Sequence, residues 1–586
     1  MTFLPTSQKE LDNRGWDYVD VIILSGDAYV DHPSFGAAVI GRVLEAQGYR
    51  VAIVPQPNWR DDLRDFRKLG APRLFFGVTS GCMDSMVNRY TANKRTRSSD
   101  AYTPDGRSDM RPDYACYVYA KIAKQLFPQT PVILGGIEAS LRRLTHYDYW
   151  QDALRPSILH DTHADLLVYG MGEMPIVEAA RRLRDGNDVR SLTNIPQTAY
   201  LTASQNIADS IAANPAWARP VELHSFENCV KSKRHFAENF VHVEQESNKL
   251  QAAPLLESVG SSVVVVNPPY PPMSEAEIDA SFDLPYTRIP HPRYAGKRIA
   301  AYEMVRHSVN IHRGCFGGCS FCTISMHQGK FVASRSPQSV LREVKHVAQM
   351  PDFKGYLSDV GGPSANMYAM RGRNASACSA CKRYSCLHPQ RCPNLNADHA
   401  PLIELYAQVR AMAGIKKAFV GSGLRYDLLL DEQGFISGSA RQYLAELLRH
   451  HVSGRLKVAP EHTSEPVLAA MRKPSYRLFD ALKLRFDAQN RSEALRLQLV
   501  PYFISSHPCC TEADMRQLAS ITRRQGFHLE QVQDFTPTPM TLSSTMYYTG
   551  LDPYTLQPIY VARSREQKLK QNSYFFWYKK TTPPSR

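Results

Sequence analysis

The first third of the chain alternates short apolar runs with amphipathic stretches. A helical pattern at 35–50 places Val39, Ile40, Val43 and Leu44 on one face and ends near Gly48. Continuous apolar strands separated by such helices are typical of a parallel sheet covered on both faces. We therefore predict a doubly wound, Rossmann-like α/β domain over residues 1–190. Its expected strands lie at 19–25, 51–54, 73–78, 131–136 and 165–170.

The rest of the chain follows two other patterns. Residues 191–300 are rich in Asn, Ser and Pro, and we predict an insertion or linker region there. From residue 301 the strand–helix rhythm resumes in about six units whose strands end in polar, glycine-rich loops, which favours a partial (β/α)6 barrel over 301–560. A Cys-rich insertion interrupts this barrel at 371–399. The basic, aromatic segment 561–586 has no clear periodicity, and we predict a loose tail.

Composition limits the class of protein. The 70 Lys and Arg residues exceed the 56 Asp and Glu residues by 14, which favours an acidic partner such as RNA only weakly, because a long chain usually spreads such a charge over its surface. No apolar run approaches the ~20 residues of a membrane span, and the N-terminus has no signal-peptide pattern. We therefore predict a cytoplasmic protein with no membrane contact. Its 12 cysteines should then be thiols or metal ligands rather than disulfides.

Three of these cysteines form a tight cluster in the segment HRGCFGGCSFCTISMHQGK. Cys315, Cys319 and Cys322 have the spacing C-x3-C-x2-C, and three thiolates can hold three irons of a cubane cluster while the fourth iron stays open. The alternative is a zinc site with His312 or His327 as the fourth ligand. Structural zinc prefers paired C-x2-C knuckles, and this loop has only one. The pattern therefore favours an iron–sulfur cluster.

This spacing, with an aromatic residue directly before the last cysteine, resembles the signature of the radical S-adenosylmethionine (SAM) superfamily. Phe321 fills the aromatic position. The resemblance implies that SAM binds the open iron of a 4Fe–4S cluster. The reduced cluster would then cleave SAM to methionine and a 5′-deoxyadenosyl radical, which abstracts hydrogen from a substrate. Such chemistry also implies a reducing partner such as flavodoxin or ferredoxin.

Two further segments resemble SAM-contacting parts of that superfamily. Gly361 and Gly362 end a predicted strand where radical SAM proteins usually have Gly-Gly-Glu, although Pro363 replaces the Glu. Ser422 and Arg425 lie at a later strand end, where similar proteins place polar contacts to SAM. For these two residues, barrel-top packing or turn capping is an equal alternative.

The order of segments resembles the YgiQ-type family of radical SAM proteins. KVAPEHTSEPVLAAMRKP, VQDFTPTPMT and SSHPCCTEADM are similar to parts of methylthiotransferase-type cores, with Cys509 where Gly is usual. The N-terminal domain resembles the cobalamin-binding type, whose ligand pattern is D-x-H-x-x-G. Here Asp31 directly precedes His32, and Gly36 lies four residues beyond. Because of this departure, cobalamin is a doubtful cofactor.

A second cysteine cluster lies in the segment CSACKRYSCLHPQRC. Cys378, Cys381, Cys386 and Cys392 have the spacing C-x2-C-x4-C-x5-C. Four thiolates can close a tetrahedral zinc site or hold an auxiliary iron–sulfur cluster, and the spacing alone does not distinguish the two. We predict a second metal site here, structural or electron-relaying rather than catalytic.

The leading functional hypothesis is a radical SAM enzyme with an unknown substrate. A sharper version is an RNA-modifying, methylthiotransferase-like enzyme, although no dedicated RNA-binding module is recognisable. The non-catalytic alternative is an iron–sulfur electron-transfer protein. The three-cysteine loop argues against it, because electron carriers normally have every iron bound by protein ligands. A zinc-containing nucleic-acid-binding protein built on residues 378–392 is the remaining alternative.

Overall fold

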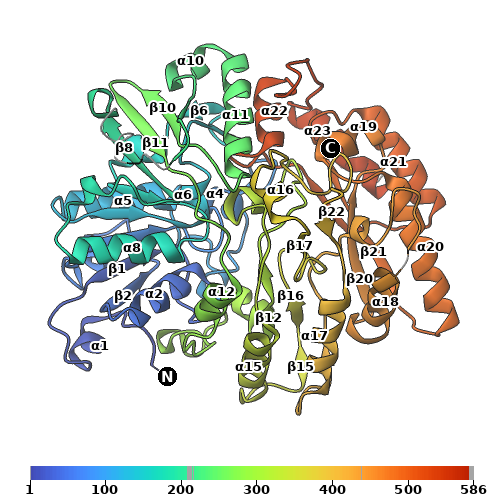
Figure 1. Ribbon diagram of the computed structural model, residues 1–586, viewed down its shortest axis with the longest axis horizontal. Helices are drawn as coiled ribbons and strands as arrows, with labels where there is room; N and C mark the ends of the chain where they lie inside the picture. The colour runs from blue at the N-terminus through green and yellow to red at the C-terminus, as the bar shows by residue number, and fades with distance from the viewer. Residues whose placement is uncertain (1, 208–213, 215–216, 437, 580–586) are drawn as a thin grey trace, which may run out of the picture.

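The computed structural model describes residues 2–207, 214, 217–436 and 438–579. Figure 1 shows two halves side by side, with the blue-to-green N-terminal half packed against the yellow-to-red C-terminal half. No helix in the described ranges is long and apolar enough to cross a membrane.

The N-terminal half is built on a nine-stranded sheet in the order β2-β1-β3-β4-β7-β8-β11-β10-β9. Its first five strands are parallel and are the five predicted from the apolar runs: β2 (Val51–Pro55), β1 (Val21–Ser25), β3 (Phe75–Thr79), β4 (Val132–Leu134) and β7 (Leu166–Val168). Helices cover both faces of these strands: α1 (Gln8–Asp12), α2 (Gly36–Ala46), α3 (Arg64–Arg67), α4 (Ser85–Arg89), α5 (Ala115–Leu126), α6 (Gly136–Ser140), α7 (Ile158–Thr162) and α8 (Glu173–Arg184). A hairpin of β5 (His146–Asp148) and β6 (Ala153–Arg155) stands apart from the sheet.

Strand β1 shows why this sheet is covered on both faces. Ile22 and Leu24 pack into the cluster that contains α5, whereas Val21 and Ile23 pack into the cluster that contains α2 and α8. Successive side chains of a strand point to opposite faces, so a continuously apolar strand needs helices on both. The predicted doubly wound α/β architecture is confirmed.

Residues 191–300 contain more structure than the predicted insertion or linker. Four strands from this segment extend the sheet: β8 (Thr198–Ala203), β9 (Val221–Glu222), β10 (Leu255–Val259) and β11 (Ser262–Val266). The segment also supplies α10 (Phe226–Lys231), α11 (Lys233–Ser247) and α12 (Glu275–Phe282), and α13 (Ala300–Val305) follows at its end. The strands were hidden because their surroundings are rich in Pro, Asn and Ser. β11 forms an antiparallel hairpin with β10 and a long-range antiparallel pair with β8. The domain boundary near residue 190 stays a prediction.

The C-terminal half is a partial barrel of six parallel strand positions in chain order, as predicted. They are β12 (Ser308–Asn310), β15 and β16 (Tyr356–Leu357 and Asp359–Gly361), β19 (Lys417–Ala418), β20 (Arg455–Glu461), β21 (Gln498–Ser505) and β22 (Gln531–Asp534). A parallel bridge from Leu424 to Val458 joins the third position to the fourth. The helices of this half are α14 (Ile324–His327), α15 (Pro337–Ala348), α16 (Ala375–Ser379), α17 (Ala400–Ala411), α18 (Gly438–Glu446), α19 (Glu465–Met471), α20 (Tyr476–Ser492), α21 (Glu512–Arg524) and α22 (Leu542–Thr549). Two short antiparallel strand pairs lie in its loops. They are β13 (His312–Arg313) with β14 (Ala333–Ser334), and β17 (Arg371–Gly372) with β18 (Leu395–Asn396).

The prediction of a loose C-terminal tail is wrong for the part of it that the structure describes. Residues Arg565–Ser573 form α23, and Phe575 beyond it is fully buried. Lys568 is only 3% exposed, and its Nζ donates to the hydroxyls of Tyr149 (2.8 Å) and Tyr547 (2.9 Å). The helix sequence REQKLKQNS has almost no apolar face, so periodicity could not reveal a helix held mainly by long-range polar contacts.

Candidate functional site

The three-cysteine loop follows β13 and runs into α14, close to the carboxyl end of the first barrel strand, β12. Burial raises the pKa of the Cys315 thiol and raises that of Cys322 to about 12, and the neighbouring Cys319 contributes to both shifts. The structure therefore brings the three predicted ligands close together in a half-buried loop. Near neutral pH, thiols with raised pKa values stay largely protonated until a metal displaces the proton.

Arg425 lies against this loop. Its Nη1 donates to Sγ of Cys319 at 3.2 Å, and its other side-chain nitrogens form a two-pronged ion pair with Asp427. Asn366 holds the backbone of Arg425 through bonds to both its N–H and its carbonyl, at 2.9 and 3.0 Å. A fixed cation beside a thiol favours the thiolate and offsets the negative charge of a cluster. The residue predicted to contact SAM thus contacts a predicted cluster ligand; its contact with SAM stays a prediction.

The two glycines at the end of β16 allow close packing that a side chain would block. A Cβ at Gly361 would lie 2.6 Å from Oγ of Ser422, and one at Gly362 would lie 2.5 Å from the ring of His312. The Ser422 hydroxyl donates to Oδ2 of Asp359 at 2.6 Å. Burial raises the pKa of this carboxyl group. Asp359 was missed in the sequence, although its position two residues before Gly361 places it on the same side of the strand.

Phe321 and the turn that contains Cys509 meet behind the cysteine loop. Phe321 lies edge-on to His507, with ring centroids 6.1 Å apart. Nε2 of His507 is 2.6 Å from Oγ of Ser543, which donates to Oγ of Ser320 in the cysteine loop at 2.8 Å. Cys509 has a φ of +72°, a left-handed conformation that Gly adopts most readily.

The second cysteine cluster packs directly on the first loop. The backbone N–H of Cys386 donates to the carbonyl of Phe316 at 3.0 Å, and the Ser385 hydroxyl donates to the carbonyl of Gly317 at 2.8 Å. Gly318, with a φ of +62°, lies so close that a Cβ there would be 2.7 Å from Cβ of Ser385. The two predicted metal sites are therefore neighbours, in keeping with the position of the second cluster just after the second barrel strand.

Charged and polar groups surround the four thiols of this second cluster. Burial raises the pKa of Cys386 to about 11, while the nearby Lys330 acts in the opposite direction. Cys381 and Cys392 lie close enough to contribute to the same shift. Lys330 is buried and donates to the carbonyl of Arg383 at 2.6 Å. Cys378, the remaining thiol of the cluster, accepts a bond from Nδ2 of Asn394 at 3.3 Å.

The spacing of the cysteine sulfurs bears on which metal they could hold. Ligands of one tetrahedral zinc ion lie about 3.8 Å apart, given a Zn–S length of about 2.3 Å. Within the described ranges, one set of three side chains places its ligand atoms within 4.8 Å of one another, and it contains no cysteine. Thiolates around a cubane lie farther apart, because irons and sulfides separate them. No set of three cysteine sulfurs in the described ranges meets the spacing of a single preformed zinc site.

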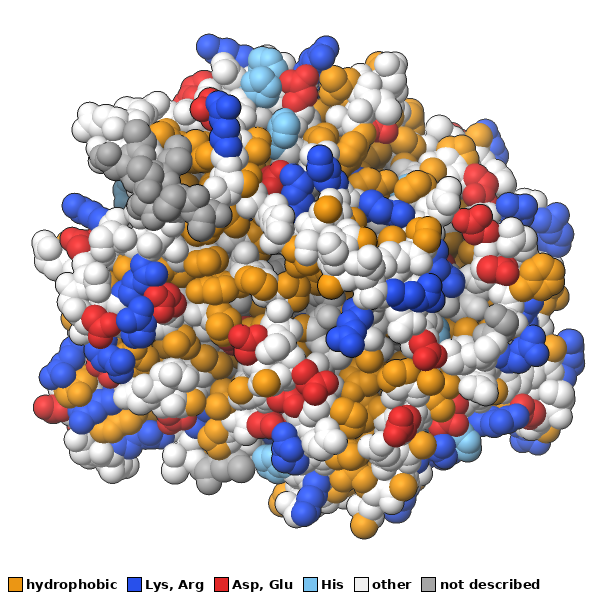
Figure 2. All heavy atoms as spheres, in the orientation of Figure 1, with side chains coloured by type: hydrophobic (Ala, Val, Ile, Leu, Met, Phe, Trp, Pro, Cys, Tyr) orange, Lys and Arg blue, Asp and Glu red, His pale blue; other side chains and the backbone are white. Residues whose placement is uncertain are grey.

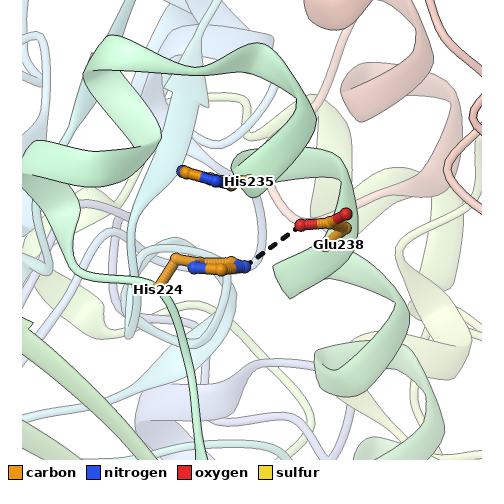
Figure 3. Close-up of side chains that lie close together, drawn as sticks. All are labelled: His224, His235 and Glu238. Carbon is orange, nitrogen blue, oxygen red and sulfur yellow. Dashed lines mark hydrogen bonds and ion pairs between the residues drawn. The ribbon is translucent and has the colours of Figure 1, made fainter.

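That one set, His224, His235 and Glu238, lies on and beside α11 (Figure 3). The two imidazole rings stack with centroids 4.1 Å apart and planes 17° apart, and Nε2 of His224 is 3.1 Å from Glu238. Parallel rings direct their nitrogen lone pairs side by side rather than toward one point. Arg234 already occupies the other Glu238 oxygen at 2.8 Å. The set forms an ion-paired stack, and we assign no metal to it.

A cavity of about 460 Å³ lies between the two halves of the molecule. It is bounded by the carboxyl ends of β1, β3, β4 and β7, and across from them by the start of α14 and by Pro363. His32, considered as a cobalamin ligand, does not line it: the side chain is buried elsewhere, and its Nδ1 accepts the backbone N–H of Ser34 at 3.1 Å. Asp31 is likewise occupied by a buried ion pair with Arg42. Sequence reasoning missed the cavity, although glycine-rich strand ends were its signal.

Comparison with known proteins agrees with this architecture. The family model described as "Radical SAM N-terminal" matches residues 3–308, and a "Domain of unknown function (DUF3362)" matches residues 530–582. A UPF0313 protein of Bacteroides thetaiotaomicron is 61% identical, covering 98% of this chain and 94% of the relative. A UPF0313 protein of Porphyromonas gingivalis is 62% identical, covering 99% and 90%. The UPF0313 protein YgiQ of Escherichia coli K12 is 42% identical, covering 97% and 82%.

Among solved structures, one that matches is the radical SAM methyltransferase TsrM of Kitasatospora setae, with cobalamin and a 4Fe–4S cluster bound. The match has a TM-score of 0.49 and 13% identity, and it covers 89% of this chain and 73% of that chain. This likeness is too distant to carry an argument about ligands. The sequence relatives and the family model are decisive: the chain belongs to the radical SAM superfamily, within the UPF0313 family that includes YgiQ.

Proposed function

We propose that this protein is a radical SAM enzyme whose 4Fe–4S cluster is held by Cys315, Cys319 and Cys322. The observation that carries the proposal is the loop itself: three half-buried thiols close together beside the first barrel strand, with Arg425 donating to one of them. Three protein ligands leave one iron open for SAM. An electron carrier would have no use for that open position, so the enzymatic hypothesis is favoured over electron transfer.

When bound, the cluster and SAM supply an electron transfer that yields methionine and a 5′-deoxyadenosyl radical. The chain's own residues would bind, orient and shield these groups. Gly361 and Gly362 keep the strand end free of side chains, and Phe321 offers a ring for adenine. Ser422 and Asp359 form a hydrogen-bonded pair at the same strand end. Asp359 would thus provide the carboxylate for the SAM amino group that Pro363 cannot.

The electron must come from outside the chain, and flavodoxin or ferredoxin is the class of donor we propose. An RNA substrate is not favoured by any observation. On the face shown in Figure 2, basic and acidic side chains are interspersed rather than gathered into a basic stripe. The cytoplasmic location stays a prediction.

We further propose that Cys378, Cys381, Cys386 and Cys392 bind an auxiliary iron–sulfur cluster. One observation favours iron over zinc: the loop contacts the three-cysteine loop directly. A cluster held in a loop that contacts the three-cysteine loop could pass electrons to the first cluster. Four protein ligands would close its coordination, so it would not bind SAM.

The test is metal analysis and electron paramagnetic resonance (EPR) on anaerobically reconstituted protein. We expect close to eight irons per chain, a reduced-cluster signal that changes on adding SAM, and slow formation of 5′-deoxyadenosine. Replacing Cys315, Cys319 and Cys322 together by Ala should abolish the SAM-responsive EPR signal. Cys381→Ser should lower the iron content but leave that signal unchanged. A SAM-responsive signal in the triple variant would refute the first proposal. Unchanged iron, or a loss of zinc instead, in Cys381→Ser would refute the second.

A further inference from the structure

The cavity between the two halves lies where doubly wound sheets bind ligands. The strand order reverses at β1, which has β2 on one side and β3 on the other. Ligands of such sheets bind outside the carboxyl ends of the strands at this switch point. The 460 Å³ cavity occupies that position, and its opposite wall includes Thr323 and Ile324, which directly follow Cys322. A molecule in the cavity would therefore lie beside the three-cysteine loop.

Two helices begin at the cavity without a side-chain cap. Helix α2, of 11 residues, starts at Gly36, and helix α8, of 12 residues, follows Gly172 as its N-cap; neither N-cap side chain bonds the first turn. Gly36, Ala37, Gly172 and Glu173 all line the cavity. The first N–H groups of a helix need acceptors, and the helix dipole adds partial positive charge there. At α8 the Glu173 carboxylate already lies at its own backbone N–H, whereas α2 has no acidic residue in its first turn, so the start of α2 is the end that favours an oxyanion.

His312 supplies an independent indication that a ligand is missing. It is 1% exposed, it lines the cavity, and both ring nitrogens are buried without a hydrogen-bond partner among the described residues. Such orphaned groups are rare in native proteins, because each costs the lost solvation of a polar atom. A ligand acceptor or donor in the cavity would satisfy at least one of these nitrogens.

The other residues that line the cavity indicate the chemical character of the rest of the ligand. The charged side chains at the cavity, Glu173 and Arg313, form an ion pair with each other, so neither is left to hold a second charge. Most other lining residues are aliphatic or glycine: Ile23, Val39, Ile40, Val78, Ile133 and Ile176 are among them. The cavity thus combines one oxyanion-binding end with an apolar interior, and its volume suits a small molecule rather than a polymer.

We propose that this cavity binds the substrate of the radical reaction, and that the substrate is a small organic molecule with a phosphate or carboxylate group on a mostly apolar body. That the ligand is a substrate rests on the proposed function. That the cavity binds such a molecule does not. The SAM contacts proposed above lie on the barrel side, at Gly361, Gly362 and Ser422, which do not line the cavity. His312 packs on Gly362 and would bridge the two sites.

The site can be tested without knowing the substrate, using two pairs of probes that differ only by a phosphate. Flavin mononucleotide is compared with riboflavin, and AMP with adenosine, by equilibrium binding to the reconstituted protein. We expect at least one phosphate-bearing probe to bind about tenfold more tightly than its parent. Ala37→Trp, which fills the cavity from the second position of α2, should weaken that binding at least tenfold. Ala46→Trp, at the exposed end of the same helix, is the matched control and should not.

A second variant separates cavity filling from misfolding. His312→Phe keeps a ring against Gly362 but removes both nitrogens, and we expect a several-fold loss of probe binding with normal iron content. The proposal is overturned if neither phosphate probe is preferred over its parent, or if Ala37→Trp leaves the preferred probe bound as before. Probe binding needs no SAM cleavage. A chain that prefers the phosphate but never forms 5′-deoxyadenosine would refute only the proposed function.

Discussion

The contact between the two cysteine loops depends on Gly318, and replacing this residue by Ala tests it. Gly318 has a φ of +62°, and a Cβ there would lie 2.7 Å from Cβ of Ser385 and 2.8 Å from the carbonyl oxygen of Tyr384. Real Cβ atoms essentially never approach within 3.0 Å, so the loops would have to separate. Gly329 is the matched control: its φ is +88°, and a Cβ there would meet nothing within 4 Å.

The magnitude follows from comparing the two variants. An L-residue in the left-handed region costs about 1–2 kcal/mol, and both substitutions incur this cost. Only Gly318→Ala adds the overlap with Ser385 and Tyr384, and overpacking of this kind costs about 1–3 kcal/mol. Because the added cost falls on the contact itself, the opening of the 378–392 loop should become about 5- to 160-fold more frequent in Gly318→Ala than in Gly329→Ala.

Hydrogen exchange of peptides spanning 378–392, measured anaerobically by mass spectrometry, reports this opening directly. Gly318→Ala should exchange faster there, while peptides from the N-terminal sheet stay unchanged in both variants. The metal content of the second cluster should fall in parallel. Equal exchange in the two variants would refute the reasoning, because the shared backbone strain would then account for the whole effect and the loops would not press on each other.

Three further predictions concern other parts of the molecule. Burial lowers the pKa of Lys568 from 10.5 to about 8, so between these pH values the unfolded chain holds a proton that the folded chain lacks. As pH rises through this window, the wild type should gain up to about 3 kcal/mol of stability relative to Lys568→Met. Melting temperatures of the two proteins that change in parallel with pH would exclude this effect. Arg142→Met should lower the free energy of unfolding in urea by about 3–5 kcal/mol, because it leaves the buried Asp84 without its ion-pair partner. The exposed control Arg181→Met should lower it by less than about 1 kcal/mol. Similar losses in the two variants would contradict the buried ion pair as the cause. Phe321→Ala should weaken anaerobic SAM binding by about 1 kcal/mol in calorimetry if its ring packs on adenine, and an unchanged affinity would remove Phe321 from the SAM site.

The sequence by itself determined the features that depend on neighbouring residues. The apolar runs of β1, β2, β3, β4 and β7, and the amphipathic pattern of α2 ending at Gly48 with its φ of +83°, arise from side-chain periodicity within one element. The three-cysteine loop is equally local, because its ligands lie within eight positions. These features established the doubly wound domain, the six-unit barrel and the radical SAM family.

Only the tertiary structure decided which distant segments meet. Arg425 contacts Cys319 across 106 positions, and Ser422 contacts Asp359 across 63. The contact of the two cysteine loops, the burial of the polar helix α23 and the orphaned His312 at the cavity depend in the same way on how the barrel closes against the N-terminal sheet. Periodicity records which face of an element is apolar, but not which element covers that face. Polar contacts between strand ends leave no periodic pattern at all, and for that reason the site had to be found in three dimensions.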